Sequence, residues 1–199
     1  MSRRLSSFLA AGVAALLIVP AASALRVHVR VEGKTRTIYG STEPTLTVST
    51  NALDALESAS VAGEFYYHVA TSAFGPYVDQ VGRYLAAGSN GWVFKVNGVS
   101  PPIGADRVAL KDGDRVLWYW ATFGPRGGPP TLVLRAGAKR GCYRVLSQDD
   151  NGKTTAARRA RLHVGSRSVL ARSGSACVGA HRGLVTATLK GAVRSNAVR

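Results

Sequence analysis

The sequence predicts a mainly β protein with one helix, built as a small α+β domain followed by a β-sandwich. Short runs of alternating apolar and polar residues recur along the chain, and turn residues such as glycine, asparagine and aspartate separate them. One segment, which starts at Asn51 or just before it, has the pattern of a short helix. A stretch rich in glycine and proline, residues 124–130, divides the runs into two groups.

The first 24 residues predict a secretion signal. Arg3 and Arg4 precede an apolar run at residues 8–19, and small residues follow at 22–24. A Sec-type signal peptide that is cut after Ala24 has this organisation. The apolar run is shorter than the roughly 20 residues that a helix needs to cross a bilayer, and retention as a membrane anchor stays the open alternative. We therefore expect a secreted protein whose mature chain has no transmembrane segment.

The elements before residue 90 follow from alternation and from capping residues. Extended segments are expected at residues 25–33, 35–39, 45–48 and 65–71. Thr50 or Asn51 is expected to cap a helix that places Leu53 and Leu56 on one side, because an N-cap side chain accepts a hydrogen bond from an unpaired backbone N–H. The pattern of residues 77–86 fits either a strand or a helix, and both assignments stay open.

The segment 91–98 is the first of two strands that carry all three tryptophans. Trp92 and Phe94 occupy alternate positions, so a strand places both rings on one face. Asn97 and Gly98 end this strand, since both residues tolerate positive φ. The segment therefore predicts a strand with an aromatic row and a tight turn after it.

The second of these strands is expected at the end of segment 110–120, after an Asp-Gly-Asp turn. Trp118 and Trp120 share a face there. Aromatic rings could stack on a flat ligand, such as a corrin ring or a sugar, and they could equally form the core of a thin sheet. The candidate ligand-binding residues are Trp92, Phe94, Asn97, Trp118, Tyr119 and Trp120. Core packing is the favoured interpretation for Trp92, Phe94 and Trp118, and the other two aromatics are expected to be partly exposed.

These two segments resemble the transcobalamin-like C-terminal domain, a family of bacterial extracellular domains that also occurs at the C-terminal end of animal cobalamin carriers. The shared motifs read GW from Gly91, VNG from Val96, GAD from Gly104, KDGD from Lys111 and VLWYW from Val116. An earlier segment from Thr47 is similar to the family's helix. The resemblance covers residues 25–123 and implies a β-grasp-like fold, with cobalamin or a related tetrapyrrole as a bound ligand.

A small β-sandwich is predicted for residues 131–199, beyond the linker at 124–130. Short strands are expected at residues 131–136, 142–148, 160–165, 168–172 and 183–189. Their spacing and the turn residues between them are typical of such a sandwich. The segment 142–195 also resembles, more weakly, a transthyretin-like or carboxypeptidase-regulatory-like domain, through LHVG from Leu162 and TATLKGAVRS from Thr186.

Cys142 and Cys177 are the only two cysteines, and a disulfide between them is expected in an exported chain. On the chain-entropy model this bond stabilises the fold by about 4 kcal/mol. The alternative is a secreted thiol enzyme in which His181 activates Cys177. No other catalytic motif is present, so we expect a protein without catalytic activity. We expect no metal site, because the acidic segment 149–152 lacks further oxygen ligands and suits a hairpin turn.

Positive charge is concentrated in the second half of the chain. Residues 126–199 carry fifteen Lys or Arg and two acidic residues, a net charge of +13, whereas residues 25–125 carry nine of each. Anionic cell-wall polymers, lipid head groups and acidic polysaccharides are the partners that such a surface attracts outside a cell. Nucleic acid is not an expected partner of an exported chain. The alternative interpretation of the charge is a solubilising surface.

Together these observations predict a secreted binding protein that is extracellular or associated with the cell wall. Its first domain is expected to contact a small molecule, cobalamin-like according to the resemblance, or a glycan. Its second domain is expected to associate with an anionic cell envelope. The alternative is a structural or adhesive envelope protein without a small-molecule ligand.

Overall fold

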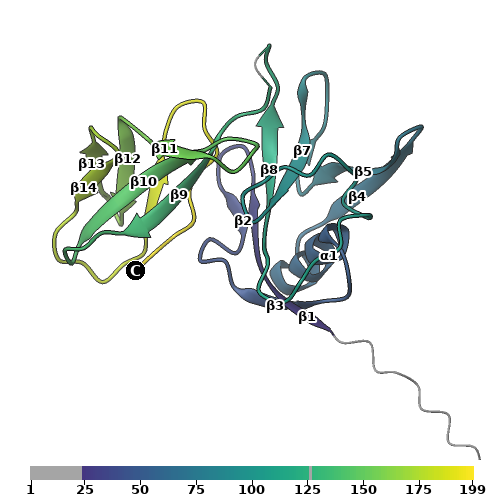
Figure 1. The fold of residues 1–199 in the computed structure, drawn as a ribbon, viewed down its shortest axis with the longest axis horizontal. Coiled ribbons are helices and arrows are strands. Elements are labelled where there is room, and N and C mark those ends of the chain that lie inside the picture. The colour runs from purple at the N-terminus through teal and green to yellow at the C-terminus, as the bar shows by residue number, and fades with distance from the viewer. Residues whose placement is uncertain (1–23, 126) are drawn as a thin grey trace, which may run out of the picture.

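The computed structural model describes residues 24–125 and 127–199, which form two β-rich regions (Figure 1). The N-terminal region, purple to teal, lies on the right of Figure 1, and the C-terminal region, green to yellow, lies on the left. The described chain is mainly β with one helix, which confirms the predicted fold class. The predicted signal peptide lies outside the described residues, apart from Ala24. No helix within the described ranges is long and apolar enough to cross a membrane.

The N-terminal region is built on a mixed five-stranded sheet. Its elements are β1 (Leu25–Glu32), β2 (Thr37–Tyr39), β3 (Thr45–Val48), α1 (Ala52–Gly63), β4 (Tyr67–Ser72), β5 (Gly75–Val81), β6 (Tyr84–Leu85), β7 (Asn90–Val96) and β8 (Arg115–Thr122). Strands β2, β1, β8 and β7 lie side by side in that order, and β3 also pairs with β1. The first and last of the nine elements, β1 and β8, pair in parallel, while the other pairs in this sheet are antiparallel. With one helix packed on one face, this order is a β-grasp arrangement.

Helix α1 begins at a capping box, and Asn51 rather than Thr50 is its N-cap. Asn51 Oδ1 accepts hydrogen bonds from the backbone N–H groups of Leu53 and Asp54, each at 2.9 Å. Asp54 Oδ2 accepts the backbone N–H of Asn51 in return, at 3.1 Å. The buried residues of the helix are Ala52, Ala55, Leu56 and Ala59. They pack on the valines of β1, so one face of the sheet is covered by the helix.

The segment 77–86, for which strand and helix stayed open, forms most of β5 and all of β6. Gly75 and Pro76 are the first residues of β5. Strands β4, β5 and β6 make a separate antiparallel sheet. Val78 and Val81 of β5 are buried in the main core, so this small sheet closes the core beside α1.

The C-terminal region consists of two sheets that enclose a second hydrophobic core. Its strands are β9 (Thr131–Ala136), β10 (Cys142–Gln148), β11 (Thr154–Ala156), β12 (Ala160–Val164), β13 (Arg167–Ala171), β14 (Ser175–Cys177) and β15 (Val185–Thr188). Strand β10 pairs with β9, β11 and β14, and β12 pairs with β13 and β15. Buried residues of both sheets, such as Leu134 and Leu162, share one core, as in a sandwich. The predicted hairpin at 149–152 joins β10 to β11.

The predicted disulfide is confirmed. Cys142 and Cys177 are bonded to each other, and no cysteine of the chain is free. The two residues stand opposite each other on β10 and β14. The bond therefore links the short strand β14 to β10, the central strand of this sheet.

The second face of the N-terminal sheet is covered by the C-terminal region. Tyr119 of β8 and Val193 belong to a third hydrophobic cluster between the two regions. Lys95 of β7 is only 1% exposed, and its Nζ donates to the backbone oxygen of Asp149 at 2.8 Å and to Thr131 Oγ1 at 3.3 Å. The two larger cores lie on either side of residues 124–130, while the exact domain boundaries stay a prediction.

Charged side chains are buried in the same interface. Glu32 accepts a hydrogen bond from Arg30 at 3.4 Å and another from Arg194 at 2.9 Å. Arg30 Nε also lies 3.3 Å from Glu43 Oε1, and its Nη1 donates to the backbone oxygen of Arg194 at 3.0 Å. Burial raises the pKa of Glu32, against the opposing effect of the two arginines, and burial lowers the pKa of Arg30 to about 10. The network links β1 to the C-terminal end of the chain.

Stability at high pH is expected to depend on Tyr119. Burial, followed by the negative charge of Asp150, raises the pKa of Tyr119 to about 12. The unfolded chain loses this phenol proton at about pH 10, whereas the folded chain keeps it, so the contribution of the phenol to stability is complete below that pH and is lost as pH rises toward about 12. Urea unfolding should show that the wild type loses stability relative to Tyr119→Phe as pH rises from about 10 to about 12. Tyr66→Phe, at a 59% exposed position, is the matched control, and identical profiles for both substitutions would contradict the assignment.

Candidate functional site

Four of the six candidate ligand-binding residues form one cluster, which we call the aromatic row: Trp92, Phe94, Trp118 and Trp120. Strands β7 and β8 pair so that Trp92 stands opposite Trp120 and Phe94 stands opposite Trp118. The ring centroids of the first pair are 5.7 Å apart, and those of the second pair, which stack, are 4.9 Å apart. The alternation in the sequence therefore located these four side chains on one face of the sheet.

The aromatic row serves mainly as core. Trp92 is 7% exposed and Trp118 is 2% exposed, while the other two rings are half-buried. The indole N–H of Trp92 donates to the backbone oxygen of Tyr84 at 2.8 Å, and that of Trp118 donates to the backbone oxygen of Ala52 at 3.1 Å. Each tryptophan thus links the sheet to a neighbouring element. These contacts agree with the core interpretation for Trp92 and Trp118.

Tyr119 and Asn97 lie apart from the aromatic row. Tyr119 points to the opposite face of the sheet and is 2% exposed, so the expectation of partial exposure was wrong. The reason is that the C-terminal region covers that face. Asn97 has a φ of +53°, donates to Asp114 Oδ1 at 2.8 Å and accepts the backbone N–H of Arg115 at 3.0 Å. Its side chain therefore holds the turn between β7 and the loop that follows.

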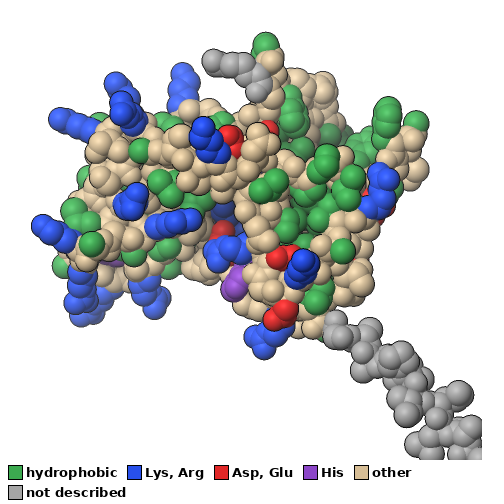
Figure 2. Space-filling view, in the orientation of Figure 1, with side chains coloured by type: hydrophobic (Ala, Val, Ile, Leu, Met, Phe, Trp, Pro, Cys, Tyr) green, Lys and Arg blue, Asp and Glu red, His purple; other side chains and the backbone are tan. Residues whose placement is uncertain are grey.

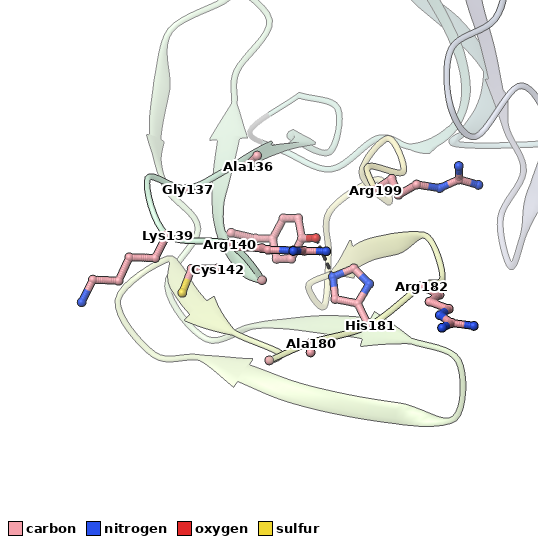
Figure 3. A pocket seen from close by; sticks show the side chains of 12 residues that line it. Ala136, Gly137, Lys139, Arg140, Cys142, Ala180, His181, Arg182 and Arg199 are labelled. Carbon is pink, nitrogen blue, oxygen red and sulfur yellow. Dashed lines mark hydrogen bonds between the residues drawn. The ribbon is translucent and has the colours of Figure 1, made fainter.

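A cleft of about 650 Å³ lies in the C-terminal region, within the roughly 300–1,000 Å³ range of ligand sites. We call it the basic cleft. It is lined by Ala136, Gly137, Lys139, Arg140, Gly141, Cys142, Tyr143, Gly179, Ala180, His181, Arg182 and Arg199. Four of these side chains are cationic and none is acidic. Figure 3 shows Lys139 on one side of His181 and Arg182 with Arg199 on the other.

Tyr143 and His181 form the polar centre of the basic cleft. The Tyr143 hydroxyl lies 2.7 Å from His181 Nε2 (Figure 3). His181 Nδ1 lies 2.9 Å from the backbone oxygen of Gly183. A carbonyl oxygen only accepts, so Nδ1 carries a hydrogen, and in the neutral imidazole Nε2 accepts the hydroxyl hydrogen of Tyr143. This chain of hydrogen bonds fixes both rings. Tyr143 is buried and lies at the base of the cleft, whereas the four cationic side chains are exposed.

The surroundings of the cleft are also basic. Figure 2 shows lysine and arginine side chains distributed over the C-terminal region, on the left, where few acidic side chains are visible. Long-range attraction therefore favours an anion near this part of the molecule. Within the cleft, Arg140 and Arg182 offer planar guanidinium groups that suit carboxylate, phosphate or sulfate oxygens. The arrangement can bind anions.

The disulfide removes the free thiol that a thiol enzyme would use as its nucleophile. Cys177 is bonded to Cys142, and His181 hydrogen-bonds to Tyr143 instead of a thiol. Within residues 24–125 and 127–199, no group of three or more His, Cys, Asp or Glu side chains is placed to hold a metal ion.

Sequence reasoning identified the basic half but not the basic cleft. Its cations come from three separate segments: the loop before β10, the loop before β15 and the end of the chain. Only the excess of Lys and Arg signalled such a site. Which of the fifteen cations converge depends on how β10 and β14 are joined, and no local pattern encodes that.

Comparison with known proteins finds one family over part of the chain. The family described as Domain of unknown function (DUF4430) matches residues 49–122, less than half of the chain. No curated protein matches. Among solved structures, one of a "putative metal binding protein" from Ruminococcus gnavus ATCC 29149 is 17% identical, covers 48% of this chain and 95% of that chain, and has a TM-score of 0.37. The chain is thus similar to the DUF4430 family from the start of α1 to the end of the second aromatic strand.

Proposed function

We propose that this chain is a secreted, non-catalytic binding protein that holds anionic material outside the cell through its basic cleft. The observation that carries the proposal is the composition of the cleft, with four cationic side chains, no acidic one and a volume suited to a ligand. The net charge of +13 on residues 126–199 adds long-range attraction. The proposed ligands are the phosphate, carboxylate or sulfate groups of cell-wall polymers, lipid head groups or acidic polysaccharides.

Secretion is supported by the leader pattern of residues 1–24 and by the disulfide, since such bonds persist in oxidising compartments. The disulfide also supports the absence of thiol chemistry. The bond lies in the wall of the basic cleft, because Cys142 is one of the lining residues. The disulfide restricts the two adjoining loops and keeps their cations at fixed positions, which lowers the entropic cost of binding.

We propose that the N-terminal region acts mainly as a structural scaffold. Its aromatic row is packed against α1 and the small sheet, which favours the structural alternative over a corrin or glycan that stacks on exposed rings. The resemblance to transcobalamin-like domains and the DUF4430 match cover the same strands. They support a shared fold for this region, and a tetrapyrrole ligand is the less favoured proposal.

The basic cleft is tested by removing two of its cations. Arg140→Ala with Arg182→Ala is expected to weaken the binding of a labelled anionic polymer, dextran sulfate, by roughly tenfold, because each lost charge contributes modestly at an exposed site. Fluorescence anisotropy with the chain from residue 25 measures the affinity, and neutral dextran is the ligand control. Binding should also weaken as salt concentration rises.

The matched control carries the same change in net charge elsewhere. Arg158→Ala with Arg161→Ala removes two exposed cations that do not line the basic cleft. A small effect of this control, beside a large effect of the cleft variant, supports the site. Equal losses would mean that net charge alone attracts the polymer, and an absence of binding by the wild type would end the proposal.

A further inference from the structure

A small cavity of about 100 Å³ lies between the aromatic row, strand β5 and the loop at residues 104–106. It is lined by Leu53, Val69, Pro76, Tyr77, Val78, Trp92, Phe94, Gly104, Ala105, Asp106 and Trp118. Most of these side chains are apolar, and four are aromatic. Tyr77 is 50% exposed, so it lies at the mouth of the cavity. We call this site the aromatic cavity, and it is separate from the basic cleft in the other region.

Asp106 is the one acidic residue in this lining, and no Lys, Arg or His accompanies it. Its Oδ1 atom is buried and has no hydrogen-bond partner among the described residues. None of the ion pairs within the described ranges includes Asp106. A carboxylate with one oxygen sealed from water and from donors is poorly solvated, so a nearby positive charge would stabilise it.

The rings around Asp106 favour the same kind of ligand. The negative faces of aromatic rings attract cations, and Trp binds them best. Trp92, Trp118 and Phe94 all line the cavity, and the last two stack with centroids 4.9 Å apart. The lining thus combines one formal negative charge with several aromatic rings. The carboxylate selects a positive charge, and a ring face turned toward the cavity would add to that selection.

The apolar walls decide which cation fits. A primary ammonium group or a metal ion is strongly hydrated and needs several hydrogen bonds or oxygen ligands, which this lining does not supply. A quaternary ammonium group makes no hydrogen bonds and presents methyl groups to the rings. The volume is about that of three liquid water molecules, which suits a head group of a few non-hydrogen atoms.

We propose that the aromatic cavity binds a quaternary ammonium head group of the trimethylammonium type, with the carboxylate of Asp106 as its counter-ion and Trp92, Phe94 and Trp118 as its aromatic walls. Tyr77 at the mouth contacts the rest of the ligand, which stays outside. This site is independent of the proposed anion binding. The chain then has two ligand sites of opposite charge preference, one in each region.

The test is a titration of the chain from residue 25 with choline chloride, followed by tryptophan fluorescence and by calorimetry, with sodium chloride as the salt-matched reference. Binding with a Kd of about 1 mM or below is expected. The ligand control is 3,3-dimethylbutan-1-ol, which replaces the charged nitrogen by carbon at almost the same shape. It should bind at least about tenfold more weakly, because it cannot pair with the carboxylate.

Asp106→Asn tests the counter-ion, since it removes the charge with little change in shape. It is expected to raise the Kd for choline by at least about tenfold, whereas Glu64→Gln, the same change at an exposed position outside the cavity, leaves the Kd unchanged. Thermal unfolding checks that both variants fold. The proposal is overturned if choline does not bind, if the neutral alcohol binds equally well, or if Asp106→Asn leaves the Kd unchanged. The alcohol control needs no variant, so it decides even if Asp106→Asn fails to fold.

Discussion

Arg30→Ala is expected to lower the free energy of unfolding by about 3 kcal/mol. The side chain of Glu32 is fully buried, and Arg30 and Arg194 are its two charged partners. Removing one partner of a buried pair leaves a charge that the interior compensates incompletely, which typically costs about 3–5 kcal/mol. Arg194 remains in the variant, so the lower end of that range is expected. Urea unfolding at neutral pH, followed by tryptophan fluorescence, measures the change.

Two further variants separate a buried charge from a general loss of side chain. Arg36→Ala removes an exposed arginine of the same region and should change stability by less than about 0.5 kcal/mol. Arg30→Met combined with Glu32→Leu and Arg194→Met removes the carboxylate together with both arginine partners and should recover much of the loss, because apolar residues of similar size can replace a buried ion pair or triad. A triple variant as unstable as Arg30→Ala would show that packing, and not the uncompensated charge, is the cause.

Removing the disulfide is expected to cost about 4 kcal/mol of unfolding free energy. The bond between Cys142 and Cys177 closes a loop with a sequence separation of 35, which restricts the unfolded chain. Cys142→Ala with Cys177→Ala should therefore unfold at a lower urea concentration than the oxidised wild type. In the C-terminal core, Tyr143 is the one aromatic among the buried residues and the others are small or medium apolar side chains, so we expect this region to be the first to lose its structure.

The reduced wild type is the control for this variant. It keeps the side-chain volume of both cysteines and loses only the covalent link, so it should match the alanine variant within about 1 kcal/mol. If the reduced wild type is as stable as the oxidised form, the bond contributes nothing and the core alone holds the sandwich. Binding of dextran sulfate to the reduced protein would also show whether the bond supports the shape of the basic cleft.

Most elements of the fold could be predicted because they rest on local patterns. Alternation located the aromatic strands, and the same alternation brought Trp92, Phe94, Trp118 and Trp120 to one face. The capping pattern at Asn51 located the helix. The segment 77–86 stayed open because a strand that packs on the edge of a core has no clean alternation, and the packing of Val78 and Val81 on the main core settled it.

Functional sites depended on contacts between distant segments. Asp106 was part of a family motif, yet its place beside the aromatic row follows from the path of the loop before β8. The cations of the basic cleft come together only when β10 and β14 are joined. The sequence also predicted partial exposure for Tyr119, and the second region, which packs on that face of β8, buries it instead.

The sequence by itself determined most of the secondary structure, the pairing of the cysteines and the uneven distribution of charge, because propensity, spacing and composition act over short distances or over the whole chain. Only the tertiary structure decided which side chains are buried from solvent and which come together in one site. Burial of Glu32 by Arg194, and the approach of Asp106 to Trp92 and Phe94, join residues far apart in the chain. Such contacts depend on the packing of whole sheets, and no local window of residues contains that information.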